Sequence, residues 1–126
     1  MTVLVAEGLN DSRMMMRLAL EQHGYRVLEA ETGEEAVELA RREHPDLILM
    51  DLHLPHVDGL EATRRIREIE ELRAVPIVGT STLDTEEVQA EAFAAGCTAF
   101  RRQPIDFDKF GDAADLILRA GKEKGP

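Results

Sequence analysis

Five short apolar runs recur along this chain, and a longer amphipathic segment follows each of them. Short apolar runs bounded by turn residues are typical of strands that are buried on both faces. Because neighbouring parallel strands need long crossover connections, the alternation predicts one parallel sheet with helices on both faces, which is an α/β fold. The expected strands are Val3–Ala6, Arg26–Ala30, Leu47–Met50, Pro76–Thr80 and Thr98–Phe100.

The amphipathic segments predict five helices. Asp11 or Ser12 is expected to cap the first, and Thr32 forms a capping box with Glu35 at the start of the second. The third is expected over 58–72, the fourth over 84–95 and the fifth around 107–118. The residues expected on their inner faces are Met14, Met15, Leu18 and Ala19, then Ala36, Leu39 and Ala40, then Leu60, Thr63, Ile66, Ile69 and Leu72, then Val88, Ala92 and Phe93, and last Phe107, Phe110, Ala114, Ile117 and Leu118.

Length and composition indicate one domain, residues 1–126, with 44% hydrophobic residues to build a core. The net charge of −10 argues against direct nucleic-acid binding, which needs clustered basic residues. No apolar stretch reaches the roughly eighteen residues that a membrane span requires, and no secretory signal is visible. A cytoplasmic domain without membrane contact is therefore expected, and its single cysteine, Cys97, is expected to be buried.

Polar residues follow the expected strands at the edge where open parallel sheets bind ligands. Glu7 follows the first strand, Asp51 ends the third and Ser81 follows the fourth. Two converging carboxylates repel each other unless a cation lies between them, and Mg²⁺ prefers oxygen ligands. A carboxylate beside a metal can attack phosphorus to give an aspartyl phosphate, and Ser81 can donate one hydrogen bond to it. These residues alone leave open that Glu7 is only solvated and Asp51 only caps a turn.

The segment 47–59 resembles the phosphoacceptor segment of response-regulator receiver domains. An apolar strand ends in Asp51, a short loop with Pro55 follows, and Asp58-Gly59 opens the next helix. The resemblance extends over nearly the whole chain. Its further matches are the segments 3–7, 24–27, 76–81, 95–97 and 103–105, in the order and spacing of the family.

The resemblance implies the flavodoxin-like strand order 2-1-3-4-5 and a phosphoryl group accepted on Asp51. Glu7, Asp51 and the backbone carbonyl of His53 would hold Mg²⁺, and Ser81 would bind a phosphoryl oxygen. Phe100 matches the aromatic switch position, whose ring moves inward when the hydroxyl residue shifts. The implied partners are a sensor histidine kinase or phosphotransfer protein and a downstream protein, which binds the face of the fourth helix, fifth strand and fifth helix.

Three positions depart from the family pattern. Gly8 stands where the family usually has a second acid, Gln103 stands where it has lysine, and Thr82 stands where it has a very small residue. The first two changes offset each other in charge, so the pocket keeps a formal charge of −2, counted from Glu7 and Asp51. Because one carboxylate is missing at Gly8, we expect weak Mg²⁺ binding. Because the neutral amide of Gln103 is a weaker donor than an ammonium group, we expect impaired phosphorylation.

Two other functions compete with that of a phosphorylated receiver. The losses at Gly8 and Gln103 also suit a pseudo-receiver, which binds partner proteins without phosphorylation. An enzyme is not expected. A haloacid-dehalogenase-type phosphatase would have a second aspartate at the place of His53, and the chain has no glycine-rich dinucleotide motif.

Overall fold

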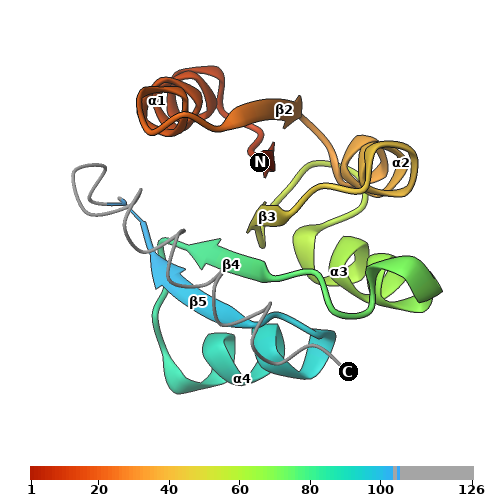
Figure 1. The fold of residues 1–126 in the computed structure, drawn as a ribbon. Coiled ribbons are helices and arrows are strands. Elements are labelled where there is room, and N and C mark those ends of the chain that lie inside the picture. Colours follow the sequence, from red (N-terminus) through yellow and green to blue (C-terminus); the bar gives the residue numbers. More distant parts are fainter. Residues whose placement is uncertain (104, 106–126) are drawn as a thin grey trace.

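A single parallel sheet forms the centre of the protein (Figure 1). The computed structural model describes residues 1–103 and 105. The strand order is β2-β1-β3-β4-β5, which confirms the expected topology. The strands are β1 (Thr2–Ala6), β2 (Arg26–Ala30), β3 (Leu47–Asp51), β4 (Ile77–Ser81) and β5 (Ala99–Arg102).

Four α-helices and one short 3₁₀-helix connect the strands within the described residues. They are α1 (Asn10–Gln22), α2 (Gly33–Glu43), α3 (Gly59–Glu68), η1 (Glu70–Leu72) and α4 (Glu86–Ala95). The third helix is shorter than predicted because the backbone becomes extended at Ile69, with φ −80° and ψ 116°, before the 3₁₀ turn begins. The expected fifth helix lies outside the described residues.

Side-chain caps start three of the helices. The Thr32 side chain accepts a hydrogen bond from the Glu35 backbone N–H at 3.2 Å, which confirms the predicted cap. The Glu35 side chain accepts its bond from the Glu31 N–H at 3.0 Å and not from the Thr32 N–H that a capping box would use. Asp58 and Thr85 cap α3 and α4 in the same way. The predicted cap of α1 by Asp11 or Ser12 was wrong, because α1 begins at Asn10 and its N-cap, Leu9, makes no side-chain cap bond.

Alternate residues along each strand face two separate cores. One face of the sheet packs against α2, α3 and α4, and the other packs against α1, as the arrangement in Figure 1 shows. On the first face lie Leu4, Ile48, Met50, Ile77, Ala40, Ala62, Ile66 and Ala92. On the second lie Val3, Val5, Leu47, Leu49, Val78, Met16 and Leu20. Burial on both faces explains why the strands read as continuous apolar runs.

The inner face of α1 differs from the predicted one. Met14, Met15 and Leu18 are each about half exposed, at 46%, 53% and 48%. The residues that α1 buries are Arg13, Met16 and Leu20. These residues are three and four positions apart, so they lie on one face of the helix. Because one of them is an arginine, the spacing of apolar residues alone predicts the wrong buried face. Phe93 on α4, also expected inside, is 50% exposed.

Cys97 is 7% exposed, which confirms its expected burial. Burial raises the pKa of its thiol, so the reactive thiolate is disfavoured at neutral pH. Within the described part of the chain, no helix combines the length and the apolar character that a bilayer crossing needs.

Candidate functional site

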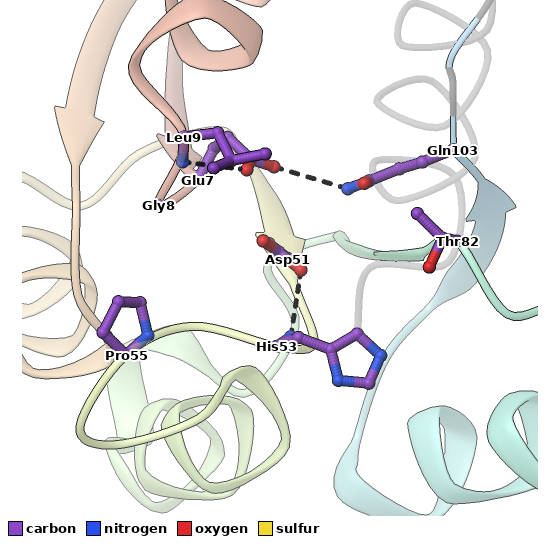
Figure 2. A pocket seen from close by; sticks show the side chains of 8 residues that line it. All are labelled: Glu7, Gly8, Leu9, Asp51, His53, Pro55, Thr82 and Gln103. Carbon is purple, nitrogen blue, oxygen red and sulfur yellow. Dashed lines mark hydrogen bonds between the residues drawn. The ribbon is translucent and has the colours of Figure 1, made fainter.

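A pocket of about 400 Å³ opens at the carboxyl edge of the sheet (Figure 2). The strand register places Asp51 of β3 beside Thr80 of β4, and Ala6 of β1 beside Met50 of β3, so the residues that leave these strands meet at one edge. The pocket is lined by Glu7, Gly8, Leu9, Asp51, His53, Pro55, Thr82 and Gln103. It therefore brings together five of the predicted site residues. Ser81 adjoins it through His53, while Phe100 packs partly buried against the core on the α2–α4 face.

Glu7 is buried at the inner wall of this pocket, with an exposed fraction of 2%. Its Oε1 accepts a hydrogen bond from the Leu9 N–H at 3.1 Å, and its Oε2 accepts one from Gln103 Nε2 at 3.3 Å. Burial raises the pKa of the Glu7 carboxyl, and the negative charge of Asp51 raises it further. The two carboxylates are thus close enough to repel each other, as their position at adjacent strand ends predicts.

Asp51 is held at the end of β3 by a tight loop. Its Oδ1 accepts a hydrogen bond from the His53 N–H at 2.9 Å. The Gly59 N–H donates to the Leu52 carbonyl at 3.1 Å, so the start of α3 lies directly against the end of β3. A Cβ atom at Gly59 would lie 2.0 Å from the Asp51 carbonyl oxygen. Only glycine allows this approach, and it fixes the backbone that carries the Asp51 carboxylate.

Ser81 is completely buried, and its hydroxyl already has two partners. It accepts a hydrogen bond from the Leu83 N–H at 3.0 Å and shares another with Nε2 of His53 at 2.9 Å. His53 therefore contacts Asp51 through its backbone and Ser81 through its imidazole. The family resemblance implies a role only for the backbone carbonyl of His53, and the spacing of the residues gives no signal for the contact of its imidazole with Ser81.

Gln103 reaches across the pocket from the end of β5. Its Nε2 donates to Thr80 Oγ1 at 2.9 Å and to Glu7 Oε2 at 3.3 Å. Its backbone N–H donates to the Ser81 carbonyl at 2.8 Å. Thr80, which is 1% exposed, was not among the predicted site residues. A hydroxyl in a strand that is otherwise buried and mostly apolar was the signal that could have identified it.

Arg13 is a second residue that the sequence analysis missed. Arg13 is 9% exposed, and its guanidinium donates to the Glu7 carbonyl at 2.9 Å, to Asn10 Oδ1 at 2.6 Å and to Glu31 Oε1 at 3.2 Å. It lies 3.6 Å from Glu29 Oε1. Arg13 thereby ties the segment after β1 to the end of β2 and fixes the backbone that carries Glu7.

The oxygen ligands at this edge fit Mg²⁺ in kind and leave most of its coordination positions to water. Glu7 and Asp51 supply two carboxylates, and Mg²⁺ commonly uses one or two carboxylates together with water and phosphate oxygens. Gly8 supplies none. Within residues 1–103 and 105, no group of three or more His, Cys, Asp or Glu side chains suited to a metal is found. The donor set therefore suits a divalent cation that keeps several of its waters.

Replacing Glu7 with glutamine is expected to stabilise the fold at neutral pH in Mg²⁺-free buffer. Because the folded-state pKa of Glu7 is raised above its ordinary value of 4.5, the unfolded chain releases this proton at a lower pH than the folded chain does. The stability that Glu7 contributes is therefore lost as the pH rises from its ordinary pKa through its raised folded-state pKa. Glutamine avoids this loss, and its one carbonyl oxygen can accept one of the two hydrogen bonds that Glu7 receives from Leu9 and Gln103.

Urea unfolding at pH 7 and at about pH 4 tests this expectation. The advantage of Glu7→Gln should be present at pH 7 and should shrink toward pH 4, where Glu7 is mostly protonated in both states. The exposed Glu91, changed to glutamine, serves as the control for charge removal. An equal difference at the two pH values would contradict the raised pKa.

The known proteins that are similar in sequence and those that are similar in structure belong to one family. The family model described as "Response regulator receiver domain" matches residues 3–115. The polar-differentiation response regulator DivK from Brucella ovis is 35% identical over 109 residues, which cover 86% of this chain and 89% of that protein. DivK from Brucella anthropi is 33% identical over the same coverage.

Solved structures agree with the sequence relatives. A putative response regulator from Chloroflexus aurantiacus has a TM-score of 0.88 at 25% identity and covers 94% of this chain and 97% of that one. The receiver domain of a sensor histidine kinase from Pseudomonas aeruginosa PAO1, solved with magnesium coordinated in its active-site cleft, has a TM-score of 0.87 at 29% identity, with 94% and 97% covered. From its sequence, its sheet and the pocket at the carboxyl edge of that sheet, this chain belongs to the response-regulator receiver-domain family of two-component signalling.

Proposed function

We propose that Asp51 accepts a phosphoryl group from a histidine kinase or a phosphotransfer protein, and that Mg²⁺-dependent phosphorylation of this receiver is impaired. Receiver domains as a family interact with such donors and bind Mg²⁺ in the active site. The observation that carries the proposal is the position of the Asp51 carboxylate. It opens into the pocket beside Glu7, and the pocket also presents the amide of Gln103.

The residues of the pocket have distinct tasks in this proposal. An Asp51 carboxylate oxygen attacks the phosphorus of a phosphohistidine, the P–N bond breaks, and the departing imidazole takes up a proton. Glu7 and Asp51 would hold Mg²⁺, which would supply positive charge beside the phosphoryl oxygens. Ser81 exchanges its bond with His53 for one to a phosphoryl oxygen. Gln103 donates an N–H to another of these oxygens.

The impairment follows from what surrounds Asp51. Gln103 offers a neutral donor, and hydrogen bonds from charged donors are roughly twice as strong. Gly8 adds no carboxylate for the cation. Thr82 lines the pocket with an exposed side chain, which narrows the access to Asp51.

Intact-mass measurement after incubation with acetyl phosphate and Mg²⁺ tests the proposal. The wild-type chain is expected to gain the mass of one phosphoryl group slowly, and Asp51→Asn is expected to gain none, because the amide is not a nucleophile toward phosphorus. A hydroxylamine-sensitive adduct would identify the acyl phosphate. A mass gain that persists in Asp51→Asn would contradict the assignment of Asp51.

A pseudo-receiver is the second candidate, and one observation favours it. The polar groups of the pocket already bind one another, since Gln103 donates to Glu7 and His53 pairs with Ser81. A site that is satisfied in this way can keep its shape without a phosphoryl group. No mass gain in the folded wild-type chain would favour this candidate. In both candidates the chain acts by binding proteins and is not an enzyme.

We place the downstream partner on the face formed by α4 and β5. Phe93 on α4 is 50% exposed, although large apolar side chains are commonly buried. Phe100 of β5 packs partly buried against the α2–α4 core, so a shift of its ring would alter the neighbouring surface. The fifth helix, which was also expected on this face, lies outside the described residues.

A further inference from the structure

Both N–H groups of the Gln103 side chain are engaged. A primary amide has two N–H donors, and Nε2 of Gln103 lies 2.9 Å from Thr80 Oγ1 and 3.3 Å from Glu7 Oε2. A phosphoryl oxygen on Asp51 can therefore receive a hydrogen bond from Gln103 only if one of these two bonds is given up. The structure indicates which one it is.

The hydrogen bond to Thr80 holds the Gln103 amide in place. Thr80 is 1% exposed and lies on β4 directly beside Asp51 in the strand register. The Gln103 backbone N–H also donates to the carbonyl of Ser81, the next residue of β4, at 2.8 Å. Gln103 is thus attached to two consecutive residues of one buried strand, through its side chain and through its backbone.

The hydrogen bond from Gln103 to Glu7 is the one that is more easily given up. At 3.3 Å it is the longer of the two, and its acceptor is one of the two carboxylates that a divalent cation would use. A cation held by Glu7 would compete with the Gln103 N–H for the Glu7 carboxylate and would weaken this hydrogen bond. The same N–H then remains at the wall of the pocket, because the bond to Thr80 holds the rest of the amide.

We propose that Thr80 is a positioning residue for phosphoryl recognition. It holds the Gln103 amide so that the N–H now shared with Glu7 passes to a phosphoryl oxygen on Asp51. The inference rests on the proposed function. A glutamine side chain has several rotamers, so a free amide would lose conformational freedom on binding, whereas an anchored amide is already oriented. Thr80 thereby orients the neutral amide of Gln103 for a hydrogen bond to a phosphoryl oxygen, at a position where the family has a lysine.

The plain alternative is that Gln103 only satisfies a buried hydroxyl. Both explanations make the hydrogen bond stabilising, so a stability measurement cannot separate them. They differ in what the loss of the Thr80 hydroxyl does to phosphoryl transfer, and in whether that effect requires Gln103. A double-mutant cycle between the two positions makes this distinction.

The cycle uses Thr80→Val, Gln103→Leu and the double variant, with acetyl phosphate, Mg²⁺ and intact mass as the readout. Valine matches threonine in shape and suits a buried strand. Thr80→Val is expected to slow phosphoryl uptake about three- to tenfold, the size of one neutral hydrogen bond, and to act on the maximal rate more than on the apparent KM for acetyl phosphate. In the Gln103→Leu background the same exchange should have no further effect.

Two control variants test whether the effect depends on the hydroxyl group and on its position in the pocket. Thr80→Ser keeps the hydroxyl and should retain most of the wild-type rate. Thr63→Val makes the same exchange at a completely buried threonine of α3 that does not line the pocket, and it should leave the rate unchanged. An equal slowing by Thr80→Val with and without Gln103, or no slowing in folded protein, would overturn the inference.

A second readout separates this inference from the proposed function. The side-chain ¹⁵N–¹H resonances of Gln103 should lie apart from those of free glutamine in the wild-type chain, shift on Mg²⁺ addition, and collapse toward free values in Thr80→Val. If the wild-type chain gains no phosphoryl mass while these shifts occur as stated, the proposed function fails and the anchoring by Thr80 stands. Resonances that do not respond to Thr80→Val would overturn the anchoring itself.

Discussion

A Gly59→Ala variant is expected to lose about 3 kcal/mol or more of its free energy of unfolding, at the upper end of the costs of overpacking. The added Cβ atom would lie 2.0 Å from the Asp51 carbonyl oxygen and 2.7 Å from Leu52 Cα. Both are backbone atoms of a buried strand end, so neither can turn aside as a flexible side chain would. The start of α3 must move away from β3, which also displaces the loop that holds Asp51.

Urea unfolding followed by circular dichroism measures this loss. Gly24→Ala is the matched control, because Gly24 has a φ of +87° and open space around its missing Cβ. That exchange should cost only the ~1–2 kcal/mol of a left-handed backbone. If Gly59→Ala cost no more than Gly24→Ala, the close approach of α3 to β3 would be wrong.

The double variant Gly8→Asp with Gln103→Lys is expected to take up phosphoryl groups from acetyl phosphate at least about tenfold faster than the wild-type chain. A lysine supplies a charge-assisted donor to the phosphoryl oxygens, and such bonds are roughly twice as strong as neutral ones. A third carboxylate strengthens the binding of Mg²⁺. The two changes together leave the net charge of the pocket as it is, so neither new charge is left without an opposite one.

The single variants separate the two contributions. Gly8→Asp should raise Mg²⁺ affinity, measured by calorimetric titration, while Gln103→Lys should act mainly on the rate at saturating Mg²⁺. A Cβ atom at position 8 would lie 3.1 Å from Pro55 Cδ, so Gly8→Ala is needed as the control for crowding. Equal Mg²⁺ affinity in wild type and Gly8→Asp would contradict the weak binding that we propose.

Much of the fold could be predicted from the sequence because its signals are local. Runs such as 47–50 are apolar along their whole length since both of their faces are buried, and capping residues such as Thr32 act within one helical turn. The meeting of Glu7 with Asp51 also followed from the sequence. Parallel strands end at one edge, so residues that leave neighbouring strands come together there.

What the sequence by itself determined is the succession of strands and helices along the described chain, the carboxylate pair at the sheet edge and the departures from the family pattern at Gly8, Gln103 and Thr82. Only the tertiary structure decided which face of α1 is buried, because the polar side chain of Arg13 fills a core position by binding backbone and side-chain oxygens. It likewise decided that Thr80 binds Gln103 and that His53 binds Ser81. These partners are far apart in the chain, and only the distance between packed strands and loops determines whether such polar groups meet.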